Sequence, residues 1–118
     1  MTIQIYHNPR CSKSRETLGL LQQRGIEPEI ILYLESPPSP ETLKQLLAAA
    51  GFSEPRQLMR RNEEIYKTLG LADKTLTEDQ LLAAMASHPK LIERPLVVNG
   101  DRARLGRPPE QVLEILDC

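Results

Sequence analysis

The stretch TIQIYHNPRCSKSRETLGLLQQRGIEPEIILYL, residues 2–34, decides the fold. Apolar and polar residues alternate over TIQIYH, which predicts a short strand that ends at the turn-forming Asn-Pro pair of residues 8–9. A helical stripe of apolar residues follows over residues 12–23, and Gly25 is a natural stop. Residues 29–34 are β-branched and apolar, which predicts a buried strand. The stretch therefore predicts a βαβ unit.

The middle of the chain, residues 39–88, is predicted to be a helical insert. Ser39 is a good N-cap for a helix that begins at Pro40 and runs through Ala50, because proline is favoured at the first helical position. Two short helical segments follow, and then a helix over residues 77–87 with apolar residues on one face.

The pattern returns to strands after the insert. Residues 96–98 and 102–105 are predicted strands, and the Asn-Gly pair at 99–100 between them is a strong hairpin signal. Two prolines then open a last helix over residues 108–116. The order β-α-β, helical insert, β-β-α predicts an α/β fold with a four-stranded mixed sheet.

Length and composition narrow the possible functions. A chain of 118 residues most often forms one domain, so we expect a single domain over residues 1–118. Hydrophobic residues make up 40% of it, enough for a core without disulfides or metals. The net charge of −1 and the 3% of aromatic residues argue against a nucleic-acid partner, which needs basic excess and stacking platforms. We also expect no membrane partner and a cytoplasmic location, since neither a secretory signal nor a membrane-spanning apolar run is visible.

Cys11 follows the first predicted strand and precedes the first predicted helix, so it should lie at a helix N-terminus. Free N–H groups and the helix dipole favour a thiolate there. Arg10, Lys13 and Arg15 are expected to lower the thiol pKa further, and a thiolate is a nucleophile. A buried structural thiol is the alternative, but it fits poorly among so many charged residues.

Several kinds of thiol site can be set aside. A local dithiol would need a second cysteine where Ser14 stands, and a phosphatase-type loop would need arginine where Thr17 stands. A zinc site would need several ligands, whereas His7 is the only one near, so no metal is expected. A single nucleophilic cysteine beside an oxyanion site remains. His7 could pair with the thiolate or only hydrogen-bond the loop, and the sequence leaves both open.

Five segments of the chain resemble a known family: IYHNPRCSKSRETL, ILYLESPPS, LMRRNEEIYKTLGL, HPKLIERPLVV and RLGRPPEQVLEIL. They occur in this order and cover nearly the whole chain. Together they resemble the glutaredoxin- and glutathione-dependent arsenate reductases, in particular the short subgroup of that family. The resemblance implies a thioredoxin-like fold and arsenate reductase activity. It also implies an arsenate-like oxyanion as substrate, glutathione as co-substrate, glutaredoxin as partner and no bound cofactor.

The resemblance also implies functional residues. The motif H-N-P-x-C-x-x-S-R and three family arginines place the catalytic residues on Cys11, Arg60, Arg94 and Arg107, and the auxiliary residues that tune the thiolate on His7, Ser14 and Arg15. Planar guanidinium groups bind the oxygens of arsenate bidentately. Thioredoxin-like folds place a cis-proline close to the active site, which corresponds to Pro95 here. Arg61 is then expected to belong to a solvated helix face.

In the reaction that the family implies, the Cys11 thiolate attacks arsenic and forms a covalent thioarsenate adduct. An external thiol is then needed, because Cys118, the last residue, is poorly placed to resolve it. Two alternatives stay open. One is a regulatory module of the Spx type that binds RNA polymerase, although Ser14 removes the dithiol switch of that type. The other is a thiol-dependent reductase of a different substrate, since the loop reads R-C-S-K-S where longer arsenate reductases often have A-C-G-x-S.

Overall fold

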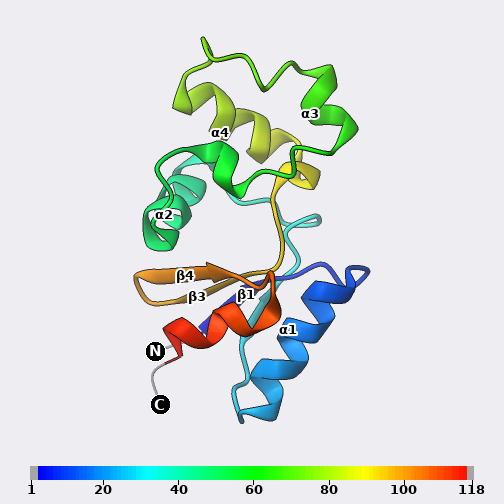
Figure 1. Cartoon of the computed structure of the whole chain (residues 1–118), viewed down its shortest axis with the longest axis vertical. Coiled ribbons are helices and arrows are strands. Elements are labelled where there is room, and N and C mark those ends of the chain that lie inside the picture. Colours follow the sequence, from blue (N-terminus) through cyan, green and yellow to red (C-terminus); the bar gives the residue numbers. More distant parts are fainter. Residues whose placement is uncertain (1–2, 117–118) are drawn as a thin grey trace. The chain divides into compact units, whose positions relative to one another are not determined.

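The structure is a computed structural model that describes residues 3–116 (Figure 1). These residues form two compact units. The sheet unit contains the residues up to Ser36 and those from Arg94 onward, and the helical unit is Pro37–Glu93. The expectation of one domain over residues 1–118 stays a prediction, because this division describes packing within the chain only.

The sheet unit is built on four short strands, β1 (Ile3–Tyr6), β2 (Glu29–Ile31), β3 (Leu96–Asn99) and β4 (Arg102–Leu105). Their order in the sheet is β2-β1-β3-β4. β1 pairs with β2 in parallel, and β1 with β3 and β3 with β4 are antiparallel. The predicted four-stranded mixed sheet is therefore confirmed. One of its two interior strands, β1, leads directly into the loop that carries Cys11.

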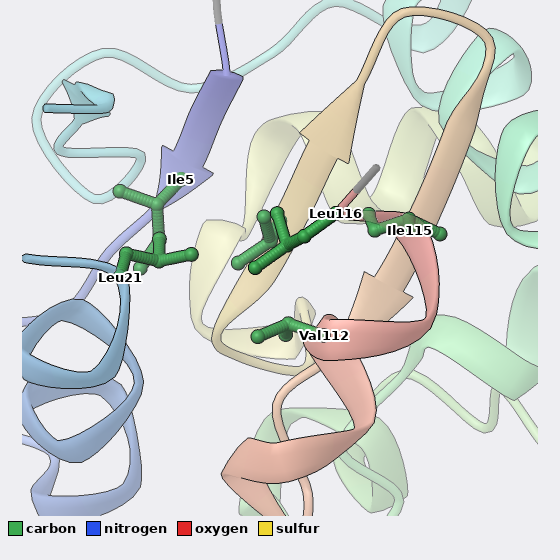
Figure 2. Packing of buried hydrophobic residues seen from close by; sticks show 6 residues of the cluster. Ile5, Leu21, Val112, Ile115 and Leu116 are labelled. Atoms are coloured by element: carbon green, nitrogen blue, oxygen red, sulfur yellow. The ribbon is translucent and has the colours of Figure 1, made fainter. Parts of the chain in front are cut away.

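Two helices pack on one face of this sheet, α1 (Ser12–Gln23) and the 3₁₀ helix η3 (Pro109–Ile115). Ile5 of β1 and its cross-strand partner Val97 point to this face. They pack with a fully buried leucine of α1 and with apolar residues of η3 and its end, namely Leu21, Val112, Ile115 and Leu116. Figure 2 shows the side chains of Ile5, Leu21, Val112 and Ile115 turned toward a common centre. Burial of this cluster fixes α1, and with it the position of its N-terminus, against the sheet.

The strand predicted over residues 29–34 is only three residues long and is not buried. Ile30, Leu32 and Leu34 are all exposed. β2 is an edge strand, and its register with β1 ends at the pair Tyr6 and Ile31. The chain beyond turns back, with the N–H groups of residues 35–36 bonded to the Leu32 carbonyl. The prediction was wrong because β1 ends there, so the apolar run has no partner strand to continue on.

Two details at the end of the chain also differ from the prediction. The hairpin register pairs Asn99 with Arg102, so its two-residue loop is Gly100-Asp101, one position later than expected. Gly100 takes the φ of +65° that the first loop residue of such a turn requires. The last helix has 3₁₀ geometry, and its end is tied to the hairpin because the side-chain amide of Asn99 donates to the Ile115 carbonyl at 2.7 Å.

The helical unit confirms the predicted insert. It contains α2 (Pro40–Ala50), α3 (Glu64–Thr68) and α4 (Glu78–Ser87), with short 3₁₀ helices at η1 (Pro55–Leu58) and η2 (Pro89–Leu91). The capping prediction holds, since the Ser39 hydroxyl accepts from the Thr42 N–H at 3.1 Å. α2 packs against α4 through buried leucines and a methionine that include Leu43, Leu47, Leu81, Leu82 and Met85.

Among residues 3–116, no helix combines the length and the apolar character that crossing a membrane would require.

Candidate functional site

Cys11 is the N-cap residue of α1, as the sequence predicts. Its backbone is extended, with φ −94° and ψ 125°, and its carbonyl accepts the first helical hydrogen bond from the Arg15 N–H at 3.0 Å. The loop before it is folded by Asn8. The Asn8 side-chain oxygen accepts from the Arg10 N–H, and its carbonyl accepts from the Cys11 N–H, both at 3.0 Å. This turn presents a half-buried thiol at the positive end of a twelve-residue helix.

A buried network supports the loop from inside. Ser14, one turn into α1, is fully buried, and its hydroxyl lies 2.6 Å from Nδ1 of the buried His7. The same oxygen accepts the Asn8 N–H at 3.0 Å. The sequence left two roles open for His7: pairing with the thiolate or hydrogen-bonding within the loop. In the structure, Nδ1 of His7 is hydrogen-bonded to Ser14, which belongs to the network that holds the loop. Ser14 therefore joins the end of β1, the loop and the first turn of α1.

The pKa of His7 is lowered, first by burial and second by the nearby Arg15 cation. Both effects disfavour an imidazolium. At neutral pH His7 is therefore an uncharged hydrogen-bonding group. Arg15 itself donates from Nη1 to the Pro9 carbonyl at 3.1 Å, so it also closes the loop from its exposed side.

The pKa of the Cys11 thiol is lowered in spite of burial, which on its own would raise it. The Ser14 backbone N–H, the Arg94 cation and the Lys13 backbone N–H outweigh the burial. The two N–H groups belong to the first turn of α1, and they stabilise the thiolate as hydrogen-bond donors, as the Arg94 side chain also does. The predicted thiolate-favouring helix terminus is thus present.

The cation that stabilises the thiolate differs from the expected ones. The sequence pointed to Arg10, Lys13 and Arg15, but the side-chain cation that lowers the pKa of Cys11 is Arg94. The Lys13 ammonium lies 3.7 Å from Glu16 on the exposed side of α1. Arg15 acts on His7 instead. The local sequence could not show which cation acts on Cys11, because the direction of each side chain depends on how the helix packs.

Arg94 and Arg107 come together in the sheet unit. Each precedes a cis peptide bond, to Pro95 and to Pro108. The cis bond at Pro95 confirms the expectation, and the one at Pro108 was not predicted. Nη1 of Arg107 donates to the Arg94 carbonyl at 3.0 Å, so the two segments that carry these arginines are tied directly. Arg94 also acts on the Cys11 thiol directly, so Cys11 and Arg94 lie together, and Arg107 is bonded to the Arg94 backbone.

Arg60 belongs to the helical unit. Its backbone N–H donates at 2.7 Å to the carbonyl of Leu91, which holds Arg60, two residues after the end of η1, against the last residue of η2. Its guanidinium forms an ion pair with Glu63 and lies 3.9 Å from Glu93. Arg61 is exposed, as predicted for a solvated position. The role of Arg60 as a site residue stays a prediction.

The sequence predicted a turn at Asn8 but did not include this residue in the candidate site. A usable signal existed, because asparagine often accepts from the backbone N–H two residues later and so shapes a turn. For a metal, no group of at least three potential His, Cys, Asp or Glu ligands exists within residues 3–116. Cys118 lies outside the described residues, so the expectation that it does not resolve the adduct stays a prediction.

The sequence of the chain is similar to a known protein family and to individual proteins of known sequence. A family model described as the ArsC family matches residues 6–115. The chain is 58% identical to the Escherichia coli K12 protein YfgD, described as uncharacterized, over 97% of this chain and 96% of that protein. It is 51% identical to an arsenate reductase of Haemophilus influenzae, over 98% of this chain and all of that protein.

A solved structure is similar over nearly the full length. The arsenate reductase from Vibrio cholerae superposes with a TM-score of 0.96 at 61% identity, covering 98% of each chain. The thioredoxin-like fold that the resemblance implies is confirmed by this likeness.

Proposed function

The chain belongs to the ArsC family, and from that premise we propose that it is an arsenate reductase whose nucleophile is Cys11. One observation carries the proposal: the thiol that caps α1 has a lowered pKa and lies beside Arg94, an anion-binding cation. A thiolate there is a nucleophile, and the guanidinium offers two parallel N–H donors to an oxyanion. The names of the Haemophilus and Vibrio relatives support arsenate as the oxyanion.

In the proposed first step, the Cys11 sulfur attacks arsenic, a sulfur–arsenic bond forms, and one arsenate oxygen leaves as water after protonation. Arg94 and Arg107 hold negatively charged oxygens of the adduct. The glutathione thiolate then bonds to arsenic and displaces a second oxygen as water. The glutaredoxin thiolate attacks the glutathione sulfur, so the glutathione–arsenic bond breaks, its electron pair reduces As(V) to As(III), and a mixed disulfide forms. Water then replaces the Cys11 sulfur on As(III) and returns the Cys11 thiol. Overall, two thiols become one disulfide while As(V) gains two electrons, and arsenite is released.

Two parts of this proposal rest on the family resemblance rather than on a contact. Glutathione and glutaredoxin enter as electron donors because an external thiol is needed to complete the reduction. Arg60 enters as a third oxyanion-binding residue by its position in the sequence LMRRN. A cytoplasmic location fits this chemistry, since a reducing compartment keeps thiols available.

The test is a coupled assay of arsenate-dependent NADPH oxidation with glutathione, glutaredoxin and glutathione reductase. We expect turnover that needs both arsenate and glutathione and that falls when glutaredoxin is omitted. Parallel reactions with phosphate, selenate and sulfate determine whether arsenate is preferred. If the enzyme turns over another oxyanion but not arsenate, the proposed substrate is wrong, while the proposed thiol site still stands.

The regulatory alternative is weaker. Ser14 stands where a dithiol switch would need its second cysteine, and its hydroxyl is committed to His7 and Asn8. The relatives with a stated activity are named as reductases. A pull-down against RNA polymerase, run beside the turnover assay, tests this alternative directly.

A further inference from the structure

Gly106 occupies a point in the sheet unit where a side chain does not fit. A Cβ atom built on Gly106 would overlap Oγ1 of Thr17 and would lie 2.8 Å from Cγ of Pro95 and 3.1 Å from Cγ2 of Thr17. Real Cβ atoms do not approach neighbours closer than 3.0 Å. Gly106 has no positive φ, so the requirement for glycine here comes from packing and not from the backbone conformation.

Three segments meet at this point, and each carries a residue of the candidate site. Thr17 belongs to α1, whose N-cap is Cys11. Pro95 follows Arg94, and Gly106 precedes Arg107. The Gly106 N–H donates to the Pro95 carbonyl at 2.9 Å, which holds the two arginine segments together on one side of the contact.

The Thr17 side chain completes the contact from the helix. Thr17 is fully buried, and its hydroxyl donates at 2.8 Å to the carbonyl of Lys13, which lies one turn earlier in α1. Its oxygen and methyl group both face Gly106. Through this one side chain, α1 rests on Gly106 and Pro95 at a point six residues, or about 1.7 helical turns, after the thiol residue.

We propose that Gly106 and Thr17 are positioning residues, and that their close contact sets the distance between the Cys11 end of α1 and the segments that carry Arg94 and Arg107. Neither residue touches the reacting atoms. A larger residue at Gly106 pushes α1 away from the arginines, so the thiolate loses part of its stabilisation. The inference rests on one part of the proposed function, namely that Cys11 is the reactive thiol.

The experiment measures the alkylation rate of Cys11 by iodoacetamide as a function of pH, in a Cys118→Ser background so that one thiol reacts. Gly106→Ala is expected to raise the apparent thiol pKa and to slow alkylation at pH 7 at least about threefold, since the rate follows the thiolate fraction. The matched control is Gly19→Ala, because a Cβ at Gly19, also in the sheet unit, meets nothing within 4 Å. Gly19→Ala is expected to keep the wild-type profile.

Two further comparisons separate positioning from simple loss of structure. The double variant Thr17→Ala/Gly106→Ala removes both Thr17 atoms that the new methyl would meet, so it is expected to recover part of the lost rate. If Gly106→Ala does not fold, Thr17→Val and Thr17→Ala give the same test. Both lose the bond to Lys13, but only valine keeps the packed shape, so Thr17→Ala should shift the profile more.

Unchanged alkylation in folded Gly106→Ala, or equal profiles for Thr17→Val and Thr17→Ala, would overturn the inference. An unreactive Cys11 in the wild-type protein would instead contradict the proposed function. Circular dichroism and thermal unfolding of each variant, measured beside the rates, confirm that the compared proteins are folded.

Discussion

Ser14 Oγ and His7 Nδ1 are 2.6 Å apart and buried, at the junction of β1 and α1. The relationship explains how a loop of a few residues holds a thiol at a helix terminus. His7 ends the strand, Ser14 lies in the first turn of the helix, and the Asn8 N–H donates to the same serine oxygen at 3.0 Å. The loop between them is thereby fixed at both ends.

Ser14→Ala is expected to lower the free energy of unfolding by about 1–3 kcal/mol, because the substitution leaves the buried His7 ring and the part-buried Asn8 N–H without this partner. Urea denaturation measures the change. Ser12→Ala is the matched control on the same helix turn, at an exposed serine. Equal stabilities for the two variants would show that the His7–Ser14–Asn8 network contributes nothing to the fold.

The lowered pKa of His7 gives the stability a pH dependence with a defined sign. Below about pH 6.5 the unfolded chain takes up a proton on His7 that the folded chain refuses, so the free energy of unfolding falls as pH falls. The loss continues until the pH passes below the folded pKa. His7→Gln removes this contribution, so its stability should fall less steeply than that of the wild type between about pH 7.5 and 5. Parallel curves for the two proteins would contradict the lowered pKa.

Arg94→Ala is expected to raise the pKa of Cys11 and to reduce kcat/KM for arsenate about 10²- to 10³-fold, the usual cost of removing one preorganised donor. The change in pKa is read from the pH profile of alkylation, and the change in kcat/KM from the coupled assay. Arg104→Ala is the control, because Arg104 forms an ion pair with the exposed Glu114 at 2.9 Å. If both variants behave alike, Arg94 has no special role at the thiol.

Arg60→Ala should separate substrate binding from thiol activation. The groups that lower the pKa of Cys11 are Arg94 and the N–H groups of Ser14 and Lys13, so the alkylation profile is expected to stay unchanged. The KM for arsenate should rise about tenfold or more if Arg60 binds the oxyanion. Arg61→Ala, at the exposed neighbour, is the matched control. An unchanged KM in Arg60→Ala would remove Arg60 from the site.

Much of the fold follows from local patterns in the sequence. The bounds of α1 match the prediction, because the loop residues before Cys11 and the glycine at position 25 mark both ends. The Ser39 cap and the αL glycine at position 51, which together delimit α2, follow known capping chemistry. The length of β2 could not be predicted from the sequence. An edge strand ends where its partner strand ends, and nothing in residues 29–34 indicates where β1 ends.

The candidate site was predictable only in part, for a similar reason. Cys11 stands out through its place before a helix and among cations. Arg94 lowers the pKa of Cys11 although the two residues are 83 positions apart in the sequence (94 − 11). Only the family resemblance indicated that Arg94 belongs to the site. The contact of Thr17 with Gly106 has no local signal, since neither a threonine in a helix nor a glycine after a strand indicates which distant residue it will meet.

In the proposed reaction, the Cys11 thiolate is the nucleophile that attacks arsenate. The most direct test of this role compares arsenite production by Cys11→Ser and Cys118→Ser with that of the wild type, with arsenate, glutathione and glutaredoxin present. Cys11→Ser is expected to show no arsenite above background, because a hydroxyl at this position is not ionised near neutral pH, and Cys118→Ser is expected to keep the wild-type rate. Arsenite formed by Cys11→Ser at a rate near that of the wild type would show that Cys11 is not the nucleophile.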